Sequence, residues 1–148
     1  IYNQLPDFNK ILNEFKNAGA QKVVWLQAHS EYLKTGIKEA LTYFNKNDSL
    51  LVEGNSFLHA HDADIGILVT TPREAKIKRS TRQIVSKIDL AVINKYTDDN
   101  PDDVIKTQER LHQIGCHAPV HIINLLQEDY TPNDVFLNHM KEMIGQSV

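Results

Sequence analysis

The stretch Asp64–Lys95, DIGILVTTPREAKIKRSTRQIVSKIDLAVINK, holds two apolar runs separated by a basic segment. The first run, Asp64 to Thr71, and the second, Ile88 to Tyr96, are rich in Ile, Leu and Val, which is typical of buried strands. The segment between them, Arg73 to Ser86, comes after Pro72 and is long enough for a helix. Strand, helix and strand in this order predict two parallel strands joined by a crossover helix.

The same alternation continues on both sides of this stretch. Three further apolar runs predict strands at Lys22 to Ala28, Ser49 to Glu53 and Val120 to Leu126. Helical spacing and capping residues predict helices at Gln4 to Ala20, from Ser30 through Phe44, from Pro101 to Gly115 and from Pro132 to Ile144. Strands that alternate with helices predict an α/β fold, a three-layer sandwich with a mainly parallel sheet, as one domain over residues 1–148.

Composition narrows the class of protein. The chain has 148 residues, of which 41% are hydrophobic and 24% charged, with a formal net charge of −3. An acidic chain with no basic stripe is not expected to bind nucleic acid. One cysteine and no apolar run of membrane-spanning length predict a cytoplasmic protein that does not cross a membrane.

Two strand ends carry residues suited to a nucleotide. Ligands of parallel α/β sheets bind beyond the carboxyl ends of the strands. Glu53 ends one predicted strand, where an acid can hold Mg²⁺ through water. Asn94 and Lys95 end another, where the amide can bond a purine edge and the lysine stem can cover a ring face. The sequence therefore predicts a nucleotide site at this edge.

The segment between the two quoted runs is basic in an otherwise acidic chain. It carries Arg73, Lys76, Lys78, Arg79 and Arg82. Such a cluster suits an anionic partner, either a phosphate or a pterin-type phosphate ligand. A solvated helix face is the alternative interpretation.

A further segment, His59-Ala-His61-Asp62, raises the hypothesis of a metal site. Alternate residues of an extended chain point the same way, and imidazoles bind transition metals. The alternative is a polar surface loop between two strands. Cys116, just past a predicted helix, is expected to be a small residue that fills a helix-end contact.

Three segments together resemble the molybdopterin-guanine dinucleotide biosynthesis protein B family. They are LPDFNKILNEFKNAGAQKVVWLQ, SLLVEGNSF and DIGILVTTPREAKIKRSTRQIVSKIDLAVINK, which extend roughly from Leu5 to Lys95. More distantly, Glu53-Gly54-Asn55 and Ile93-Asn94-Lys95 resemble segments of the GTPases that assist nickel-enzyme assembly. Both groups belong to the P-loop GTPases that service metal cofactors.

The resemblance implies a P-loop NTPase-like accessory protein of molybdenum-cofactor biosynthesis that binds GTP and Mg²⁺. It implies a homodimer that works with other molybdenum-cofactor assembly proteins. Glu53 would be the catalytic acid and would hold Mg²⁺ through water. Nucleotide or cofactor contacts would come from Gly54, Asn55, Lys76, Lys78, Asn94 and Lys95.

Two departures from the family pattern modify these expectations. The 148 residues contain no Gly-x-x-x-x-Gly-Lys-Ser/Thr run, whose amides and lysine hold phosphates. We therefore expect the central phosphate-loop strand to be missing here and to lie in an upstream segment of about 50 residues. GTPase activity would require that loop. A module of the same fold that binds without hydrolysis is the alternative, as is a metal-binding protein that uses His59 and His61. Thr97 stands where the guanine motif has an aspartate, so we expect weak discrimination of guanine.

Overall fold

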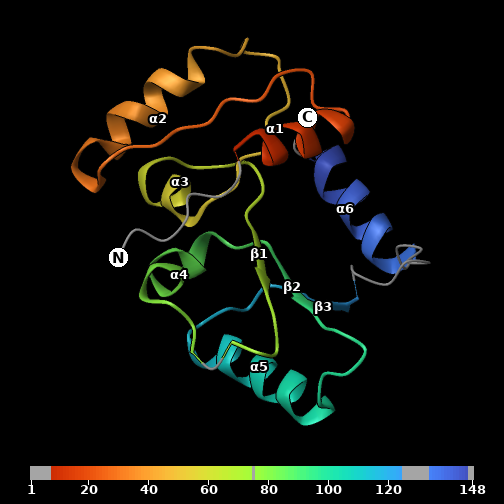
Figure 1. Cartoon of the computed structure of the whole chain (residues 1–148). Coiled ribbons are helices and arrows are strands. Elements are labelled where there is room, and N and C mark those ends of the chain that lie inside the picture. Colours follow the sequence, from red (N-terminus) through yellow and green to blue (C-terminus); the bar gives the residue numbers. More distant parts are fainter. Residues whose placement is uncertain (1–7, 75, 125–133, 147–148) are drawn as a thin grey trace. The chain divides into compact units, whose positions relative to one another are not determined.

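The computed structural model describes residues 8–74, 76–124 and 134–146 of the chain. Contacts divide the chain into two compact units, Ile1–Leu51 and Val52–Val148. Figure 1 labels the helices and strands of both units. Among the described residues, no helix is long and apolar enough to cross a membrane.

The first unit consists of helices and connecting chain. Its helices are α1 (Phe8–Asn17) and α2 (Leu33–Leu41), and a 3₁₀ turn, Ser30–Tyr32, leads into α2. Gly19 ends α1 at φ 101°, a conformation in which side chains are strained. Around it, the amide of Ala20 donates to the carbonyl oxygen of Phe15. The predicted glycine stop is therefore confirmed. The predicted cap at Ser30 is wrong, because Ser30 lies inside the 3₁₀ turn and the cap positions are His29 and Tyr32.

The predicted strand Lys22 to Ala28 is wrong. This segment has no strand pairing, and Trp25 within it is exposed. It lies along α2 instead, because Leu26 and Ala28 lie against Gly36, and the Lys22 ammonium donates to the Tyr43 carbonyl at 2.6 Å. An apolar run can bury its side chains against a helix. A strand also needs a neighbouring strand, because its backbone N–H and C=O groups require hydrogen-bond partners.

The predicted strand Ser49 to Glu53 is wrong for the same reason. None of the described residues pairs with it, and its apolar side chains are exposed, Leu51 at 84%. Glu53 therefore does not stand at the end of a strand.

The second unit contains a parallel sheet. Its strands are β1 (Ile67–Thr70), β2 (Leu90–Asn94) and β3 (Val120–Ile123), in the order β1-β2-β3. Ile67 pairs with Leu90 and Ala91 with Val120, which places β2 at the centre of the described sheet. The predicted α/β class with a parallel sheet is confirmed, although three of the five predicted strands are found among the described residues.

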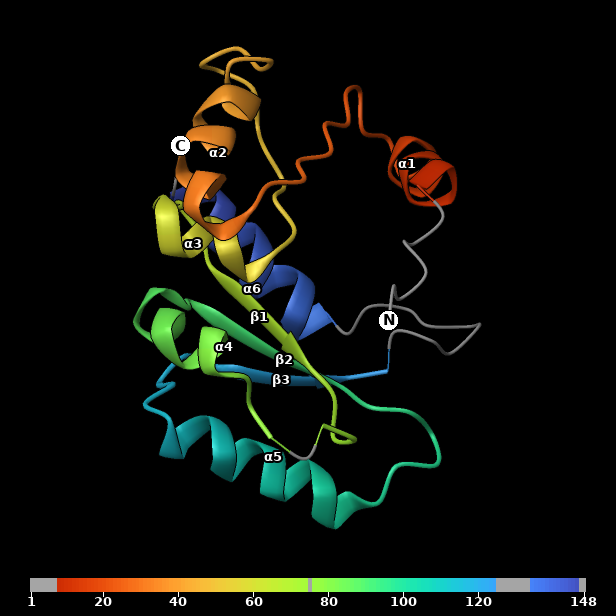
Figure 2. The same cartoon turned by 60° about the vertical axis from the view of Figure 1, so that its left-hand side comes forward.

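Helix α5 (Pro101–Gln113) covers one face of this sheet (Figure 2). Asn100 caps its start by accepting from the amide of Asp102 at 3.0 Å, and Pro101 occupies the first turn as the sequence predicts. Val104 and Leu111 of α5 belong to one buried cluster with strand residues, including Ile93. The cluster consists of Leu68, Ile84, Ile88, Ala91, Ile93, Val104, Leu111 and Cys116.

Cys116 lies at the end of α5 and is buried in that cluster. Gly115 before it takes φ 88°, and the Cys116 amide donates to the carbonyl oxygen of Leu111 at 3.0 Å. This is the bond pattern of a glycine-terminated helix. The predicted helix-end role of Cys116 is therefore confirmed.

Two short helices stand beside β1. They are α3 (Asn55–Ala60) and α4 (Arg79–Ile84), and a 3₁₀ turn, Val85–Lys87, follows α4. The predicted basic helix from Arg73 to Ser86 is thus shorter than expected at its start. Arg73 and Glu74 form a turn instead, held by side-chain contacts from α5 and from the loop after β2.

Helix α6 (Asp134–Gln146) contacts the face of the sheet opposite α5. His121 pairs with Val92, so it points away from the face of Ala91 and Ile93. Its Nε2 lies 3.0 Å from Nδ1 of His139 on α6, and its ring makes an edge contact with Phe136. One imidazole must donate and the other accept, so the contact requires at least one neutral ring.

This histidine pair predicts a loss of stability at mildly acidic pH. Burial, and then the charge of His139, lower the pKa of His121 below its ordinary value of 6.5. The unfolded chain therefore binds the proton more readily, so stability falls as pH drops below 6.5. Urea unfolding between pH 8 and pH 5 should show this fall. His121→Phe should flatten the profile and the exposed-site control His59→Gln should not; a slope unchanged in His121→Phe would contradict the assignment.

The carboxylates titrate in a separate window. The hydrogen bond from Lys87 lowers the pKa of Asp62, and the Tyr96 amide lowers that of Asp99, both from 3.8. The contribution of Asp62 and Asp99 to stability is present above pH 3.8 and is lost as pH falls below it. This loss is therefore separate from the loss that His121 causes below pH 6.5.

Candidate functional site

The loops that follow β1 and β2 meet at the carboxyl edge of the sheet. Arg73, three residues beyond β1, reaches the loop beyond β2, where its Nε donates to Asp99 Oδ1 and its Nη2 to Asp98 Oδ1, both at 2.6 Å. The guanidinium carbon stands 4.2 Å from the ring centroid of Tyr96, a cation–π contact. We call Arg73, Tyr96, Asp98 and Asp99 the carboxyl-edge cluster.

The two acids of the cluster differ in their surroundings. The Asp99 side chain is 4% exposed, and its second oxygen accepts the amide of Tyr96 at 2.6 Å. That backbone bond, and then Arg73, lower the pKa of Asp99, so it is held as a carboxylate. The Asp98 side chain is 80% exposed. Asp99 therefore anchors the loop, while Asp98 faces solvent and is accessible to a ligand.

Asn94 and Lys95, which the sequence singles out, lie beside this cluster. Asn94 is the last residue of the central strand β2, and the amide of Lys95 donates to the Ile123 carbonyl at 2.8 Å. The charge of Lys95 is also the smallest of the causes that lower the pKa of Asp99. Beyond it, Asn124 donates to Thr97 at 3.2 Å, which ties the loop to the end of β3.

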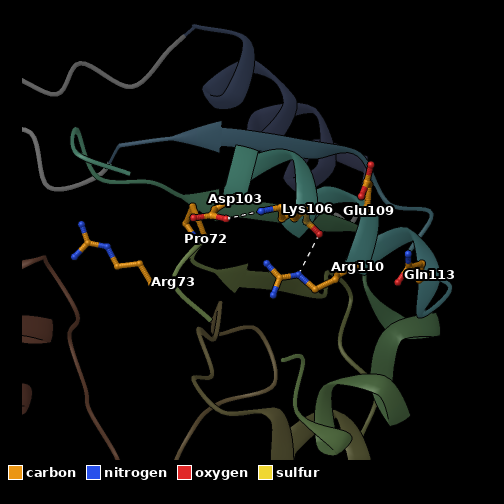
Figure 3. Close-up of a pocket in the computed structure, with 7 residues that line it drawn as sticks. All are labelled: Pro72, Arg73, Asp103, Lys106, Glu109, Arg110 and Gln113. Atoms are coloured by element: carbon orange, nitrogen blue, oxygen red, sulfur yellow. Dashed lines mark hydrogen bonds and ion pairs between the residues drawn. The ribbon is translucent and has the colours of Figure 1, made fainter. Parts of the chain in front are cut away.

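A hollow of about 500 Å³ runs from Arg73 along α5. It is lined by Pro72, Arg73, Asp103, Lys106, Glu109, Arg110 and Gln113. Figure 3 shows Arg73 at one end and Glu109 with Gln113 at the other. Lys106 pairs with Asp103 at 3.3 Å, and Arg110 donates to the Glu74 carbonyl at 2.7 Å. These charged side chains are already engaged in contacts within the protein, so the hollow alone does not identify a ligand.

A smaller cavity of about 80 Å³ brings together two other predicted residues, Asn55 and Lys78. Asn55 donates to the buried Thr81 at 3.2 Å, and Thr70 at the end of β1 also lines the cavity. Nucleotide pockets measure several hundred Å³, so this cavity holds no more than a small polar group.

The remaining predicted contacts are exposed. Glu53, Gly54 and Lys76 are all solvent-accessible, and Gly54 takes φ 129° immediately before α3. The structure therefore groups the predicted residues in two places, Asn94 and Lys95 beside the cluster and Asn55 and Lys78 at the small cavity.

The geometry assumed for a metal site at His59 and His61 is wrong. His59 belongs to helix α3 rather than to an extended segment, and His61 stacks on Phe57 at 5.3 Å. Asp62 forms an ion pair with Lys87 at 2.8 Å. Within residues 8–74, 76–124 and 134–146, no three His, Cys, Asp or Glu side chains converge as metal ligands.

Sequence reasoning missed the contacts of Tyr96 and Asp99. The sequence holds a partial signal, because TDDN follows Tyr96 and Asp and Asn favour turns in which their side chains bond nearby backbone. The sequence places Arg73 with the basic residues of a predicted helix, and nothing in its spacing indicates a bond to the loop after the second strand.

Comparison of the chain with protein-family models, curated proteins and solved structures finds no significant match.

Proposed function

We propose that this chain contributes the base-binding side of a GTP site in a P-loop NTPase-like accessory protein of molybdenum-cofactor biosynthesis. One observation carries the proposal: Asn94 ends the central strand of the described parallel sheet, and Lys95 and the accessible acid Asp98 follow it in the same loop. Ligands of such sheets bind at this edge. The role in molybdenum-cofactor biosynthesis and the homodimer are inferred from the sequence resemblance alone.

Each residue has a role in this proposal. The Asn94 amide bonds the purine edge, the Lys95 stem covers a ring face, and Asp98 supplies a carboxylate one residue beyond the position expected for the guanine motif. On the phosphate side, Lys76 and Lys78 attract the anionic group. The Mg²⁺ role of Glu53 and the contacts of Gly54 and Asn55 rest on the sequence resemblance alone, because Glu53 does not end a strand. Hydrolysis would also require a phosphate-binding loop.

Titration with non-hydrolysable GTP and ATP analogues in the presence of Mg²⁺ tests the proposal. We expect binding of both, with a preference for GTP below about a hundredfold, because Thr97 replaces the motif's aspartate and a paired base contact contributes about 1–3 kcal/mol. Asn94→Ala should weaken binding about tenfold.

The matched control is Asn138→Ala, at an exposed position on α6. The base-binding role would be refuted if neither nucleotide bound. It would also be refuted if wild type and Asn94→Ala bound with equal affinity. A preference for GTP far above a hundredfold would instead show that an acid fills the motif's role fully.

A further inference from the structure

Arg73 already donates hydrogen bonds to the carboxylates that a guanine base would use. A guanidinium is planar and presents adjacent N–H donors, which suit carboxylates. Guanine carries the same fragment, since its N1–H and 2-amino group are attached to one carbon. Adenine lacks that pair of donors. The contacts of Arg73 in the carboxyl-edge cluster therefore have the chemistry of a bound guanine edge.

The geometry supports this equivalence in two respects. The guanidinium donates to two carboxylates at 2.6 Å, and it lies over the face of an aromatic ring, as a flat ligand would. Half of the Arg73 side chain is nevertheless exposed, so it is not locked in a core.

The two bonds of Arg73 are unequal, and this allows a partial release. Asp99 is buried and uses its other oxygen on the Tyr96 amide, so its bond to Arg73 forms part of the loop's structure. Asp98 is open to solvent, where ion pairs contribute little. A ligand can therefore take Asp98 from Arg73 without breaking the contact with Asp99.

We propose that Arg73 is a competitor for the base: a guanine nucleotide binds by displacing its guanidinium from Asp98, and Arg73 thereby limits the preference for guanine over adenine. This inference rests on the proposed nucleotide function and adds the residue that sets its specificity. Removing the guanidinium is expected to strengthen guanine binding, whereas a phosphate-binding arginine would have the opposite effect.

Two variants test the competition. Arg73→Met keeps an unbranched stem over Tyr96 but has no donors, and Arg73→Ala removes the stem as well. Both should bind the GTP analogue about two- to fivefold more tightly than wild type, because an exposed ion pair contributes up to about 1 kcal/mol, with ATP-analogue binding unchanged. Asp98→Asn added to Arg73→Met should abolish the gain. Lys141→Ala, an exposed position on α6, controls for the change in net charge.

Chemical rescue provides a readout without nucleotide. Methylguanidinium should bind Arg73→Ala, shift the Tyr96 ring signals in the NMR spectrum and compete with the GTP analogue. Methylammonium, which has the charge but not the planar donors, should do neither. Retained amide spectra of both variants establish that the loop is folded.

The outcomes separate the two proposals. If wild type binds GTP but neither folded variant binds it more tightly, Arg73 does not compete and the inference is overturned, while the base-binding role stands. If wild type binds no nucleotide, the proposed function fails for this chain. Guanine binding acquired by the variants would then support the competition, and its absence would overturn that as well.

Discussion

Replacing Ile93 by alanine should destabilise the second unit by about 2–5 kcal/mol. Ile93 lies on the central strand at 0% exposure, within the cluster shared by the sheet and α5. Truncation removes buried methyl and methylene groups and leaves a cavity that neighbours on both sides cannot close. Urea unfolding followed by circular dichroism measures the loss, and hydrogen exchange of the β2 amides assigns it to this unit.

Ile122 provides a matched control for that substitution. It is the register partner of Ile93 on β3, has the same side chain and is 40% exposed. Ile122→Ala should cost about 1 kcal/mol or less. Equal losses at the two positions would contradict the burial difference across this strand pair.

Gly66→Ala should destabilise the same unit by about 2–3 kcal/mol. A Cβ at Gly66 would overlap the carbonyl oxygen of Lys87, a backbone atom that cannot rotate aside. The two backbone segments are held at this separation by two hydrogen bonds. The Gly66 carbonyl accepts from the amide of Asp89 at 2.8 Å, and the Gly66 amide donates to the Asp89 carboxylate at 2.7 Å. The substitution therefore forces apart the start of the β1–β2 pairing, which hydrogen exchange of those amides would detect.

The same substitution at Gly145 should have the opposite sign. Gly145 lies in α6, and none of the described residues outside its own helix backbone comes within 4 Å of an added Cβ. Alanine there gains helix propensity, at most about 1 kcal/mol. The unfolding midpoints of Gly66→Ala and Gly145→Ala should shift in opposite directions. A shift in the same direction would show that the contact with Lys87 does not determine the effect at Gly66.

The second unit follows the sequence closely where local and tertiary preferences agree. The run Ile88 to Tyr96 contains β2 because every residue from Leu90 to Ile93 is apolar and is buried. Asn100, Pro101 and Gly115 mark the limits of α5, because capping, a fixed φ and a positive φ are properties of single residues. Such signals need no information about distant parts of the chain.

The errors arose where the outcome depends on a distant partner. Lys22 to Ala28 has the composition of a strand, yet composition does not supply the neighbouring strand that its backbone requires. The carboxyl-edge cluster was missed in part for the same reason. Arg73 and Asp99 are separated by 26 positions, and their bond exists because β1 and β2 are parallel and adjacent.

The distribution of two rare residues has a practical consequence. The chain's single tryptophan, Trp25, is exposed in the first unit, while its single cysteine, Cys116, is buried in the second. Tryptophan fluorescence, excited where tyrosine does not absorb, therefore monitors the first unit, and the rate at which a thiol reagent reacts with Cys116 monitors opening of the second. The two units can therefore be followed on the same protein without an attached dye, the first by its emission and the second by the rate of its thiol reaction.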